Sequence, residues 1–381
     1  MNATVAGATF GEIMVKRGGS IDPSRFPDEE FDLYSIPAYD LGEPDVTAGH
    51  DIGSSKQIVE PGDVLLSRIV PHIRRAWVVG PNRGRRLIAS GEWIVFRSDK
   101  IHPDWLRHYV LSDNFHRRFM QTVAGVGGSL LRARPAQVAG LSIEIPPLNE
   151  QRRTAAILDR ADRLRVKQDE VVEHLKLLVG SVFHNSFSNE AWPSKRLDEL
   201  AEVVDCPHST PHWTDSGEVC IRTSNLVRGG WDWTDKRYVS QAEYSDRSQR
   251  GEALPGDIIL SREGTVGVAA IVEDGMKLCM GQRLVRVRTL ERLTPEYTLQ
   301  FLLHALHPDR IGFAMVGSTA RHLNVKDLRS LPIPVPPITL QKEFAYRVFL
   351  IHQLRKSKVR TSARLDELFA SLQSRTFRGE L

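Results

Sequence analysis

A chain of 381 residues is too long for a single ordinary core, so two or three domains are expected. A hydrophobic content of 41% and a charged content of 26% are typical of globular proteins and exclude disordered and fibrous classes. No apolar run approaches the roughly 18 residues of a membrane span, and the N-terminus lacks a signal-peptide layout. Three cysteines are too few for a disulfide framework. We therefore expect a cytoplasmic protein with no membrane contact.

The net charge of +4 is unevenly distributed along the chain. Residues 1–148 carry 17 basic and 17 acidic side chains, and residues 188–338 carry 18 and 20. Residues 339–381 carry 9 basic against 4 acidic side chains, so the surplus lies there. A DNA-binding face elsewhere on the chain would have to arise from local segregation of the charges.

The first 148 residues combine strand signals with a helix signal. Strands are predicted, in chain order, at residues 62–68, 92–97 and 141–145. Residues 103–111 have apolar residues at helical spacing and predict a helix. A glycine cluster at 125–128 precedes the last strand, which ends at two prolines. We expect a mixed α/β domain here.

A long helical pattern begins at these prolines and continues to about Phe187. Its apolar positions alternate four and three apart, which is the heptad pattern of two helices that wind around each other. The residues of this seam that we expect to be core are Ile157, Leu164, Val171, Leu175, Leu178 and Val182. A second long helix with the same pattern follows Pro337, and its seam residues are Ile351, Leu354, Leu365, Leu368 and Leu372. Gln168 in the first seam corresponds to Lys358 in the second, which predicts a shared polar layer.

The chain is a duplication with a period of about 190 residues. Pro61–Arg68 is repeated almost residue for residue as Pro255–Arg262, and the helix signal returns at 295–302. The order is therefore a globular domain (1–148), a spacer helix (149–190), a second globular domain (191–338) and a second spacer helix (339–381). The first helix leads directly into the domain that the second helix leaves, so the two helices must pair antiparallel. The expected fold class is α+β: two duplicated domains joined by two long helices in an antiparallel coiled coil.

The boundary motifs carry a resemblance to a known family. They are Ile145–Gln151 (IPPLNEQ), its copy Val335–Gln341 (VPPITLQ), the segments Asp205–Pro211 and Cys220–Leu226, and the ending Phe377–Leu381. In this order the chain resembles, over its whole length, the specificity subunit of type I restriction-modification systems. The resemblance implies that each globular domain is a target-recognition domain for one half of a split site in double-stranded DNA. It also implies that the helices set the spacing between the halves and dock two methyltransferase subunits.

The same resemblance places the chemistry on the partners. This chain would hold no cofactor, S-adenosylmethionine would sit on the methyltransferase subunits, and a motor-nuclease subunit is left open as a further partner. The sequence agrees in lacking a phosphate-binding loop, an amino-methyltransferase motif and a nuclease-type acidic cluster. A self-sufficient methyltransferase or nuclease, and a coiled-coil scaffold without a DNA role, remain the alternatives.

Arginines supply the candidate DNA contacts, because arginine is suited to bidentate contact with guanine or phosphate. The candidates are Arg74, Arg75, Arg83, Arg85, Arg86, Arg132, Arg134, Arg222, Arg321 and His322. Arg132 and Arg134 follow one glycine loop, and Arg321 and His322 follow the other, so these pairs occupy related places in the two repeats. Cys206, His208, His212 and Cys220 have the residue types of a zinc site but a spacing that fits no standard one, so a polar recognition loop is favoured over a metal.

Overall fold

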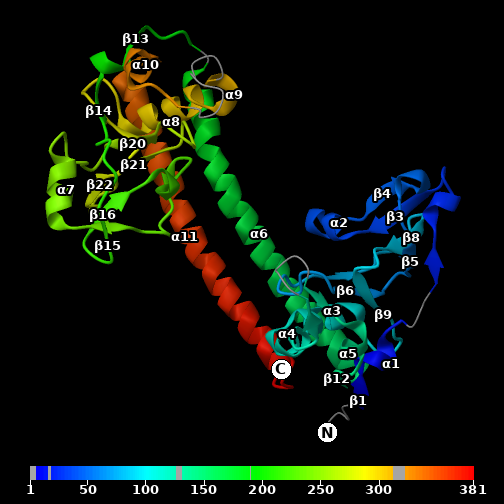
Figure 1. The fold of residues 1–381 in the computed structure, drawn as a ribbon. Coiled ribbons are helices and arrows are strands. Elements are labelled where there is room, and N and C mark those ends of the chain that lie inside the picture. The colour runs from blue at the N-terminus through cyan, green and yellow to red at the C-terminus, as the bar shows by residue number, and fades with distance from the viewer. Residues whose placement is uncertain (1–5, 16–18, 126–130, 189, 312–321) are drawn as a thin grey trace. The chain divides into compact units, whose positions relative to one another are not determined.

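The computed structural model describes all residues except 1–5, 16–18, 126–130, 189 and 312–321. Contacts divide the chain into two compact units: unit 1 comprises residues 1–169 and 360–381, and unit 2 comprises residues 170–359. Two long helices, α6 (Leu148–Phe187) and α11 (Ile338–Thr376), therefore contribute to both units (Figure 1). None of the helices in the described part of the chain is long and apolar enough to cross a membrane.

Unit 1 contains a three-stranded sheet of order β7-β6-β9 and a five-stranded sheet of order β2-β5-β8-β3-β4, with β1-β12 and β10-β11 as separate pairs. Its strands are β1 (Ala6–Thr9), β2 (Ser20–Ile21), β3 (Glu30–Tyr34), β4 (Asp45–Ala48), β5 (Lys56–Ile58), β6 (Val64–Ser67), β7 (Ala76–Val78), β8 (Arg86–Ala89), β9 (Trp93–Phe96), β10 (Val123–Ala124), β11 (Arg132–Ala133) and β12 (Ser142–Ile145). Its short helices are α1 (Phe10–Ile13), α2 (Ile36–Leu41), α3 (Pro103–Leu111), α4 (Asp113–Met120) and α5 (Pro135–Ala139). The predicted strands and helix of the first repeat are confirmed.

Unit 2 contains two four-stranded sheets, β14-β23-β20-β21 and β15-β19-β16-β22, with the pairs β13-β24 and β17-β18. Its strands are β13 (Ser194–Arg196), β14 (Ala201–Asp205), β15 (Trp213–Thr214), β16 (Glu218–Ile221), β17 (Leu226–Val227), β18 (Gly230–Trp231), β19 (Tyr238–Val239), β20 (Ile258–Ser261), β21 (Ala269–Ile271), β22 (Leu278–Met280), β23 (Leu284–Thr289) and β24 (Pro332–Pro334). Its short helices are α7 (Gln241–Ser248), α8 (Pro295–Ala305), α9 (Pro308–Ile311) and α10 (Val325–Ser330).

The repeated Pro-Gly-Asp motif forms the same turn in both units. Gly62 and Gly256 each have φ of +88°, a left-handed conformation that glycine adopts without strain. The carboxylate that follows closes the turn: Asp63 accepts a hydrogen bond from the N–H of Glu60, and Asp257 accepts one from the N–H of Leu254, both at 2.8 Å. Each Asp is almost fully buried, so it needs a cationic partner.

That partner directly follows the adjacent strand β9 in unit 1 and lies in the adjacent strand β23 in unit 2. Asp63 pairs with Arg97 at 2.6 Å, and Asp257 pairs with Arg288 at 2.7 Å. Unit 2 adds the fully buried Arg286, whose Nη1 lies 3.3 Å from Asp257. The strand pairings β6–β9 and β20–β23 fix these contacts, because Phe96 faces Val64 and Val287 faces Ile258 in the two registers.

A buried glutamine attaches the start of each long helix to its domain. The side chain of Gln151 accepts from the N–H of His102 at 2.7 Å and donates to the carbonyls of Lys100 and Pro146. Gln341 repeats this arrangement: it accepts from Thr294 at 2.9 Å and donates to the carbonyls of Arg292 and Pro336. Both glutamines are fully buried. The boundary motif therefore couples the first turn of α6 or α11 to the N-terminus of α3 or α8.

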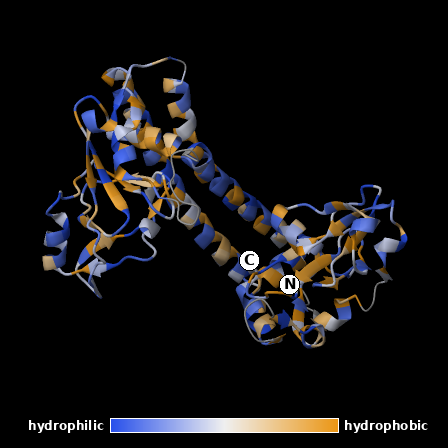
Figure 2. Ribbon diagram, turned by 45° about the horizontal axis from the view of Figure 1, so that its top comes forward, coloured by the Kyte–Doolittle hydropathy of each residue, from blue (hydrophilic) through white to orange (hydrophobic). Residues whose placement is uncertain are grey.

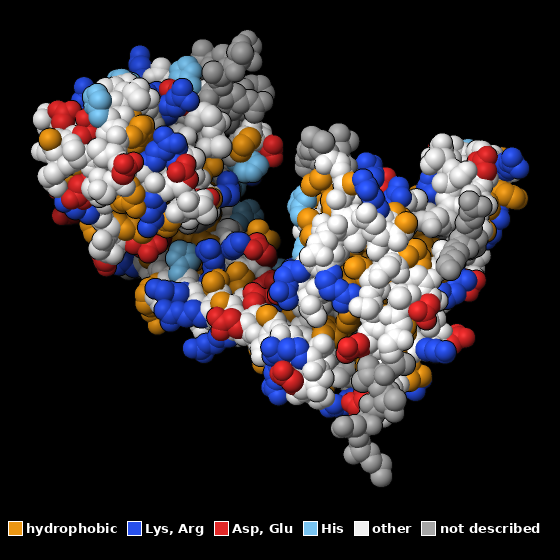
Figure 3. Space-filling view, turned by 60° about the horizontal axis from the view of Figure 1, so that its bottom comes forward, with side chains coloured by type: hydrophobic (Ala, Val, Ile, Leu, Met, Phe, Trp, Pro, Cys, Tyr) orange, Lys and Arg blue, Asp and Glu red, His pale blue; other side chains and the backbone are white. Residues whose placement is uncertain are grey.

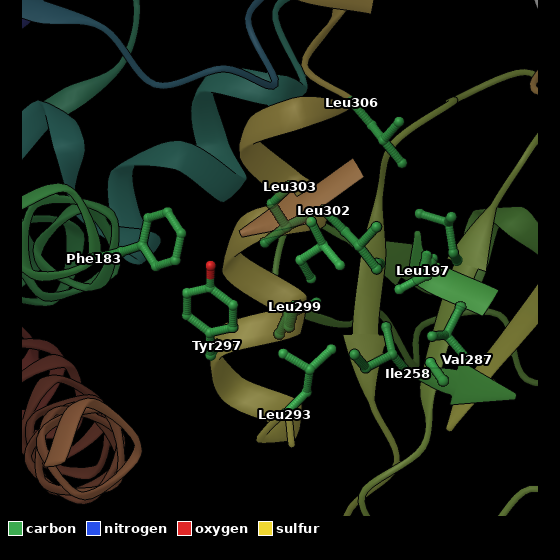
Figure 4. Close-up of a cluster of buried hydrophobic side chains, with 14 of the residues drawn as sticks. Phe183, Leu197, Ile258, Val287, Leu293, Tyr297, Leu299, Leu302, Leu303 and Leu306 are labelled. Atoms are coloured by element: carbon green, nitrogen blue, oxygen red, sulfur yellow. The ribbon is translucent and has the colours of Figure 1, made fainter. Parts of the chain in front are cut away.

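An aromatic side chain from the end of the other long helix completes each core. In unit 2, Phe187 of α6 packs edge-on against Tyr297 of α8, with ring centroids 4.8 Å apart. In unit 1, Phe377 packs edge-on against Trp105 of α3 at 5.8 Å. Figure 4 shows Phe183 of α6 directed at Tyr297, with the leucines of α8 facing the strands of unit 2. Figure 2 shows hydrophobic residues gathered on the strands inside each unit, while the long helices mix both kinds.

The helices pair antiparallel within each unit, as predicted. In unit 1 the first part of α6 contacts the last part of α11: Arg165 pairs with Asp366 at 2.7 Å and stacks over Phe369, and Ser362 donates to Asp169. In unit 2 the last part of α6 contacts the first part of α11 through Phe183 and Phe344, at 5.7 Å. Each unit therefore holds the start of one helix beside the end of the other.

Exposure divides the members of the predicted seam into two groups. The buried or half-buried members are Ile157, Leu175, Val182, Ile351, Leu365 and Leu372. The prediction is wrong for Leu164, Val171, Leu178, Leu354 and Leu368, which are 38–51% exposed. The positions one residue later are less exposed in all five cases: Arg165, Val172, Val179, Arg355 and Phe369. The side that faces the fold is therefore one residue later than predicted at these five positions. The match of Gln168 with Lys358 stays a prediction.

Candidate nucleic-acid interface

Three chain segments meet at the end of the central strand in each unit. The residue after β6 is Arg68; its N–H donates to the carbonyl of Glu92 at 3.0 Å, and its carbonyl accepts from the N–H of Ala133 at 2.8 Å. The residue after β20 is Arg262; its N–H donates to the carbonyl of Arg283 at 3.1 Å, and its carbonyl accepts from Leu323 at 2.8 Å. We call these meeting points the junctions of unit 1 and unit 2.

A buried serine fixes the direction in which the chain leaves each strand. The hydroxyl of Ser67 donates to the carbonyl of Ile69 at 3.1 Å, and that of Ser261 donates to the carbonyl of Glu263 at 3.0 Å. Ile69 then forms an isolated bridge with Arg132, and Glu263 forms one with His322. The prediction that Arg132 and His322 occupy related places is confirmed, because both enter their junctions through the same backbone pairing.

The side chains of the unit 1 junction form a chain of three charges. The Glu92 carboxylate lies between Arg68, with Nε at 3.2 Å, and Arg132, with Nη2 at 3.2 Å. Burial raises the pKa of Glu92, but the hydrogen bonds from Arg132 and Arg68 outweigh it and lower the pKa below its ordinary value. Glu92 is therefore ionised at neutral pH and holds both guanidinium groups, which remain partly exposed.

The unit 2 junction has the opposite charge at the corresponding position. Because Trp93 faces Ser67 and Leu284 faces Ser261 in the two strand registers, Arg283 occupies the place of Glu92. Its Nε lies 3.1 Å from Glu263, and its side chain is 63% exposed. Arg262, the counterpart of Arg68, is held underneath: it is 11% exposed and its Nε lies 3.2 Å from Asp205.

Most of the other arginines proposed from the sequence are paired with carboxylates. Arg74 contacts Asp113 at 2.6 Å, Arg75 contacts Asp40 at 2.8 Å, Arg85 contacts Glu30 at 2.9 Å, Arg86 contacts Glu29 at 2.5 Å and Arg222 contacts Asp235 at 2.5 Å. Arg83 and Arg134 are exposed. Arg321 and most of both glycine loops lie outside the described residues. Figure 3 shows Lys and Arg interspersed with Asp and Glu on the face in view.

Pairing changes what these arginines offer to DNA. A guanidinium that keeps its carboxylate contributes little net charge to a phosphate contact, so Arg85 and Arg86 form a mixed surface with the acids around them. They line an open hollow of about 580 Å³ together with Asp28, Glu29 and Glu30. Their role in DNA contact stays a prediction.

The four residues considered as a metal site do not come together. Cys206 and Cys220 are fully buried in two separate hydrophobic clusters. The side chains of His208 and His212 are 67% and 90% exposed, and His212 contacts Glu243. Within the described residues, no group of three or more His, Cys, Asp or Glu side chains could hold a metal ion.

Sequence reasoning missed the acidic residues of the junctions and Arg283. Arg68 and Arg262 do end the repeated Pro-Gly-Asp segment, so the repeat itself marks them. Arg283 and Glu92 carry no comparable signal, since their equivalence depends on the pairing of β9 and β23 with the central strands.

Comparison with known proteins identifies relatives over most of the chain. A family model for the type I restriction modification DNA specificity domain matches residues 189–353. The EcoKI type I restriction enzyme specificity subunit of Escherichia coli is 25% identical over 319 residues, which cover 75% of this chain and 68% of that protein. The putative MjaX specificity subunit of Methanocaldococcus jannaschii is 23% identical over 362 residues, covering 90% and 83%.

Solved structures show the same fold. A chain from a study of complex assembly and conformational transition in the type I R-M system superposes with a TM-score of 0.67 at 21% identity, covering 100% of this chain and 99% of that one. The type I S subunit from M. genitalium gives a TM-score of 0.56 at 13% identity, covering 99% and 96%.

The fold contains two related globular domains, and the backbone hydrogen bonds of their junctions correspond. The chain is similar, over most of its length, to specificity subunits of type I restriction-modification systems. Residues 189–353 match the DNA specificity domain of such systems.

Proposed function

We propose that each globular domain, 1–148 and 191–338, reads one half of a split DNA site. One observation carries this proposal: the backbone hydrogen bonds of the two junctions correspond one to one, whereas the side chains that they present differ in charge. A common backbone with different side chains can place two different sets of donors and acceptors against base edges, where sequence is read. Because the two junctions present different side chains, we expect the two half-sites to differ in base sequence.

The paired helices would set the distance between the halves. Each unit holds the start of one helix beside the end of the other, and the fully buried Gln151 and Gln341 attach the helix starts to the domains. A rigid attachment of this kind transmits a change in helix length to the separation of the domains. Exposed apolar residues on the helices, including Leu177, Tyr346 and Phe349, support their use as docking surfaces for two methyltransferase subunits.

In this proposal the chain itself performs no catalysis. The methyltransferase subunits would bind S-adenosylmethionine and carry out methyl transfer, and a motor-nuclease subunit would add cleavage. This chain would contribute recognition of double-stranded DNA and the geometry of assembly. The sequence supports that division, since it lacks the phosphate-binding loop of a motor.

The proposal is tested by co-expressing the chain with its cognate methyltransferase subunit and mapping methylated bases genome-wide. We expect one motif in two parts, separated by a fixed number of unspecified base pairs. Methylation of a continuous motif, or methylation that persists without this chain, would contradict the proposal. Turnover by the purified chain alone would instead favour a self-sufficient enzyme, and an assembly with no salt-dependent DNA binding would favour a scaffold.

The ruler role has its own experiment. Insertion of two heptads into both α6 and α11 lengthens each helix by roughly 21 Å at 1.5 Å per residue. We expect the unspecified spacer to grow by about six base pairs at ~3.4 Å per pair, with both half-sites unchanged. A spacer of unchanged length in a variant that still methylates DNA would exclude this role for the helices.

A further inference from the structure

Arg283 has an unusual backbone conformation at an exposed position. Its φ is +66°, and among the described non-glycine residues this left-handed conformation is shared only with Val70. Strained residues of this kind persist where the surrounding structure over-determines them, and they cluster at functional sites. Here the surroundings are rigid: the carbonyl of Arg283 accepts from Arg262, and the next residue, Leu284, begins β23.

The residue before Arg283 ties this corner to a second loop. The side-chain amide of Gln282 donates to the carbonyl of His208 at 2.5 Å. The same loop is fixed from its other side by the buried Arg247, whose Nη2 donates to the carbonyl of Ser209 at 2.8 Å. Arg283 therefore projects from a position that is fixed by β23, by the central strand and by the 205–211 loop.

The guanidinium of Arg283 is held at one end and exposed over most of its surface. Its contact with Glu263 is through Nε, at 3.1 Å, and Glu263 in turn contacts Arg262, with Nη1 at 3.5 Å. Bidentate recognition of guanine needs two adjacent N–H groups of an arginine that is already oriented. A carboxylate that orients Nε while 63% of the side chain stays exposed satisfies this requirement.

We infer that Arg283 is a specificity-determining residue that reads a guanine in the half-site recognised by unit 2. The inference rests on the proposed function and names the residue and the base class for that same site. It is specific to unit 2, because the corresponding residue of unit 1 is Glu92, a carboxylate already bonded to Arg68 and Arg132. Glu263 acts as a positioning residue for Arg283.

The experiment uses the complete complex of this chain with its methyltransferase subunits and a panel of DNA duplexes. Each base pair of both half-sites is replaced in turn, and equilibrium binding is measured at fixed salt for the wild type, R283Q and R283K. For the wild type we expect one G·C pair of the unit 2 half-site whose replacement weakens binding roughly 10- to 100-fold. For R283Q we expect this discrimination to vanish at that pair alone. R283K, with a single-point donor, should fall between the two.

The matched control is R292Q. Arg292 is an exposed arginine of the same unit that follows β23, whereas Arg283 precedes it, so it lies at the opposite end of the strand. We expect R292Q to discriminate at every position as the wild type does. The unit 1 half-site is an internal control in all variants, because Arg283 and Arg292 both lie in unit 2.

Three outcomes would overturn the inference. R283Q with unchanged discrimination at every pair shows that Arg283 reads no base. R283Q that weakens all duplexes equally identifies a phosphate contact instead. Lost discrimination at every pair of the unit 2 half-site indicates a structural role, which R283K would then share. Failure of the proposed function itself is distinguishable, since the wild-type complex would then show no two-part motif.

Discussion

The two junctions share their backbone hydrogen bonds and differ in the side chains that they expose. Arg68 and Arg262 have the same pair of backbone hydrogen bonds, and Ser67 and Ser261 close the same turn. The residue whose carbonyl accepts from this arginine is Glu92 in unit 1, which carries a carboxylate, and Arg283 in unit 2, which carries a guanidinium. The two repeats keep the same buried polar contacts, because losing such contacts destabilises the fold. Their exposed side chains differ, because most changes at exposed positions alter stability little.

The largest difference in stability should come from the buried ion pairs. We expect D257N to destabilise unit 2 by about 3 kcal/mol, because the fully buried Arg286 loses its buried carboxylate and keeps only the half-exposed Glu202, at 2.9 Å. D63N should cost less, because its partner Arg97 is 36% exposed and can be rehydrated. Hydrogen exchange of the β20 and β6 amides measures the two effects separately. Equal losses would show that the third charge of unit 2 is energetically silent.

Asp257 should also make the stability of unit 2 depend on pH. Burial raises the pKa of Asp257, but hydrogen bonds from Arg288 and Leu254 and the charge of Arg286 lower it below its ordinary value. A depressed carboxyl pKa contributes stability above the unfolded value of about 4 and loses it as pH falls further. Protection of β20 should therefore decline below about pH 4 in the wild type. In D257N that decline should be reduced; an undiminished decline would assign it to other groups.

The helix attachments should behave alike in the two units. Q151L and Q341L each remove three hydrogen bonds and leave a buried N–H and two carbonyls without partners. Each substitution should therefore lower the free energy of unfolding of its unit by about 2–4 kcal/mol. Hydrogen exchange at the first turn of α3 and of α8 gives the two values side by side. A large loss in one unit and a negligible loss in the other would show that only one helix is rigidly attached.

Much of this architecture could be predicted from the sequence because duplication is visible in one chain. The repeated Pro-Gly-Asp and Pro-Pro-x₃-Gln segments have local physical causes, a tight turn and a buried amide, and those causes recur in both units. The antiparallel pairing followed from chain connectivity. The phase of the helix seam could not be decided from the sequence. Apolar residues occur at the predicted positions, such as Leu164 and Leu178, and also one residue later, such as Val179.

The candidate site was harder to predict because its contacts are remote in sequence. The arginine clusters near residues 74 and 85 look basic, yet their carboxylate partners lie 35 to 57 residues away. Arg283 becomes the counterpart of Glu92 only when Leu284 is paired with Ser261. Whether an arginine is already paired with a carboxylate depends on strand register and on contacts between residues far apart in the chain. The pattern of a single sequence does not encode either of them.

A smaller effect distinguishes the two junctions directly. E92Q removes the charge that holds Arg68 and Arg132, and we expect a stability change of about 1 kcal/mol or less because all three side chains are partly exposed. Recognition of the unit 1 half-site should weaken because both arginines lose their orientation, while the unit 2 half-site stays unchanged. Methylation of duplexes altered in one half at a time measures this. Equal weakening in both halves would mean that Glu92 acts on the whole fold.

The smallest effect concerns a buried histidine of unit 1 that has Gln300 as its counterpart in unit 2. The Nε2 of His108 lies 2.7 Å from Asp159 of α6, beside Arg107, with the ring of Phe369 nearby. Burial and the charge of Arg107 lower the pKa of His108, although Asp159 and Asp162 act to raise it. Its folded pKa is thus below the unfolded value of about 6.5, so stability is present above that pH and declines below it.

Hydrogen exchange of the α3 amides between pH 5 and 8 should therefore show a modest loss of protection below about pH 6.5. H108Q introduces the side chain found in unit 2 and should flatten that profile while leaving protection at pH 8 nearly unchanged. The loss should be smaller than that caused by Q151L, since the fold keeps every backbone contact of α3. If H108Q retained the full pH dependence, another group, such as His116 with its similarly lowered pKa, would be responsible.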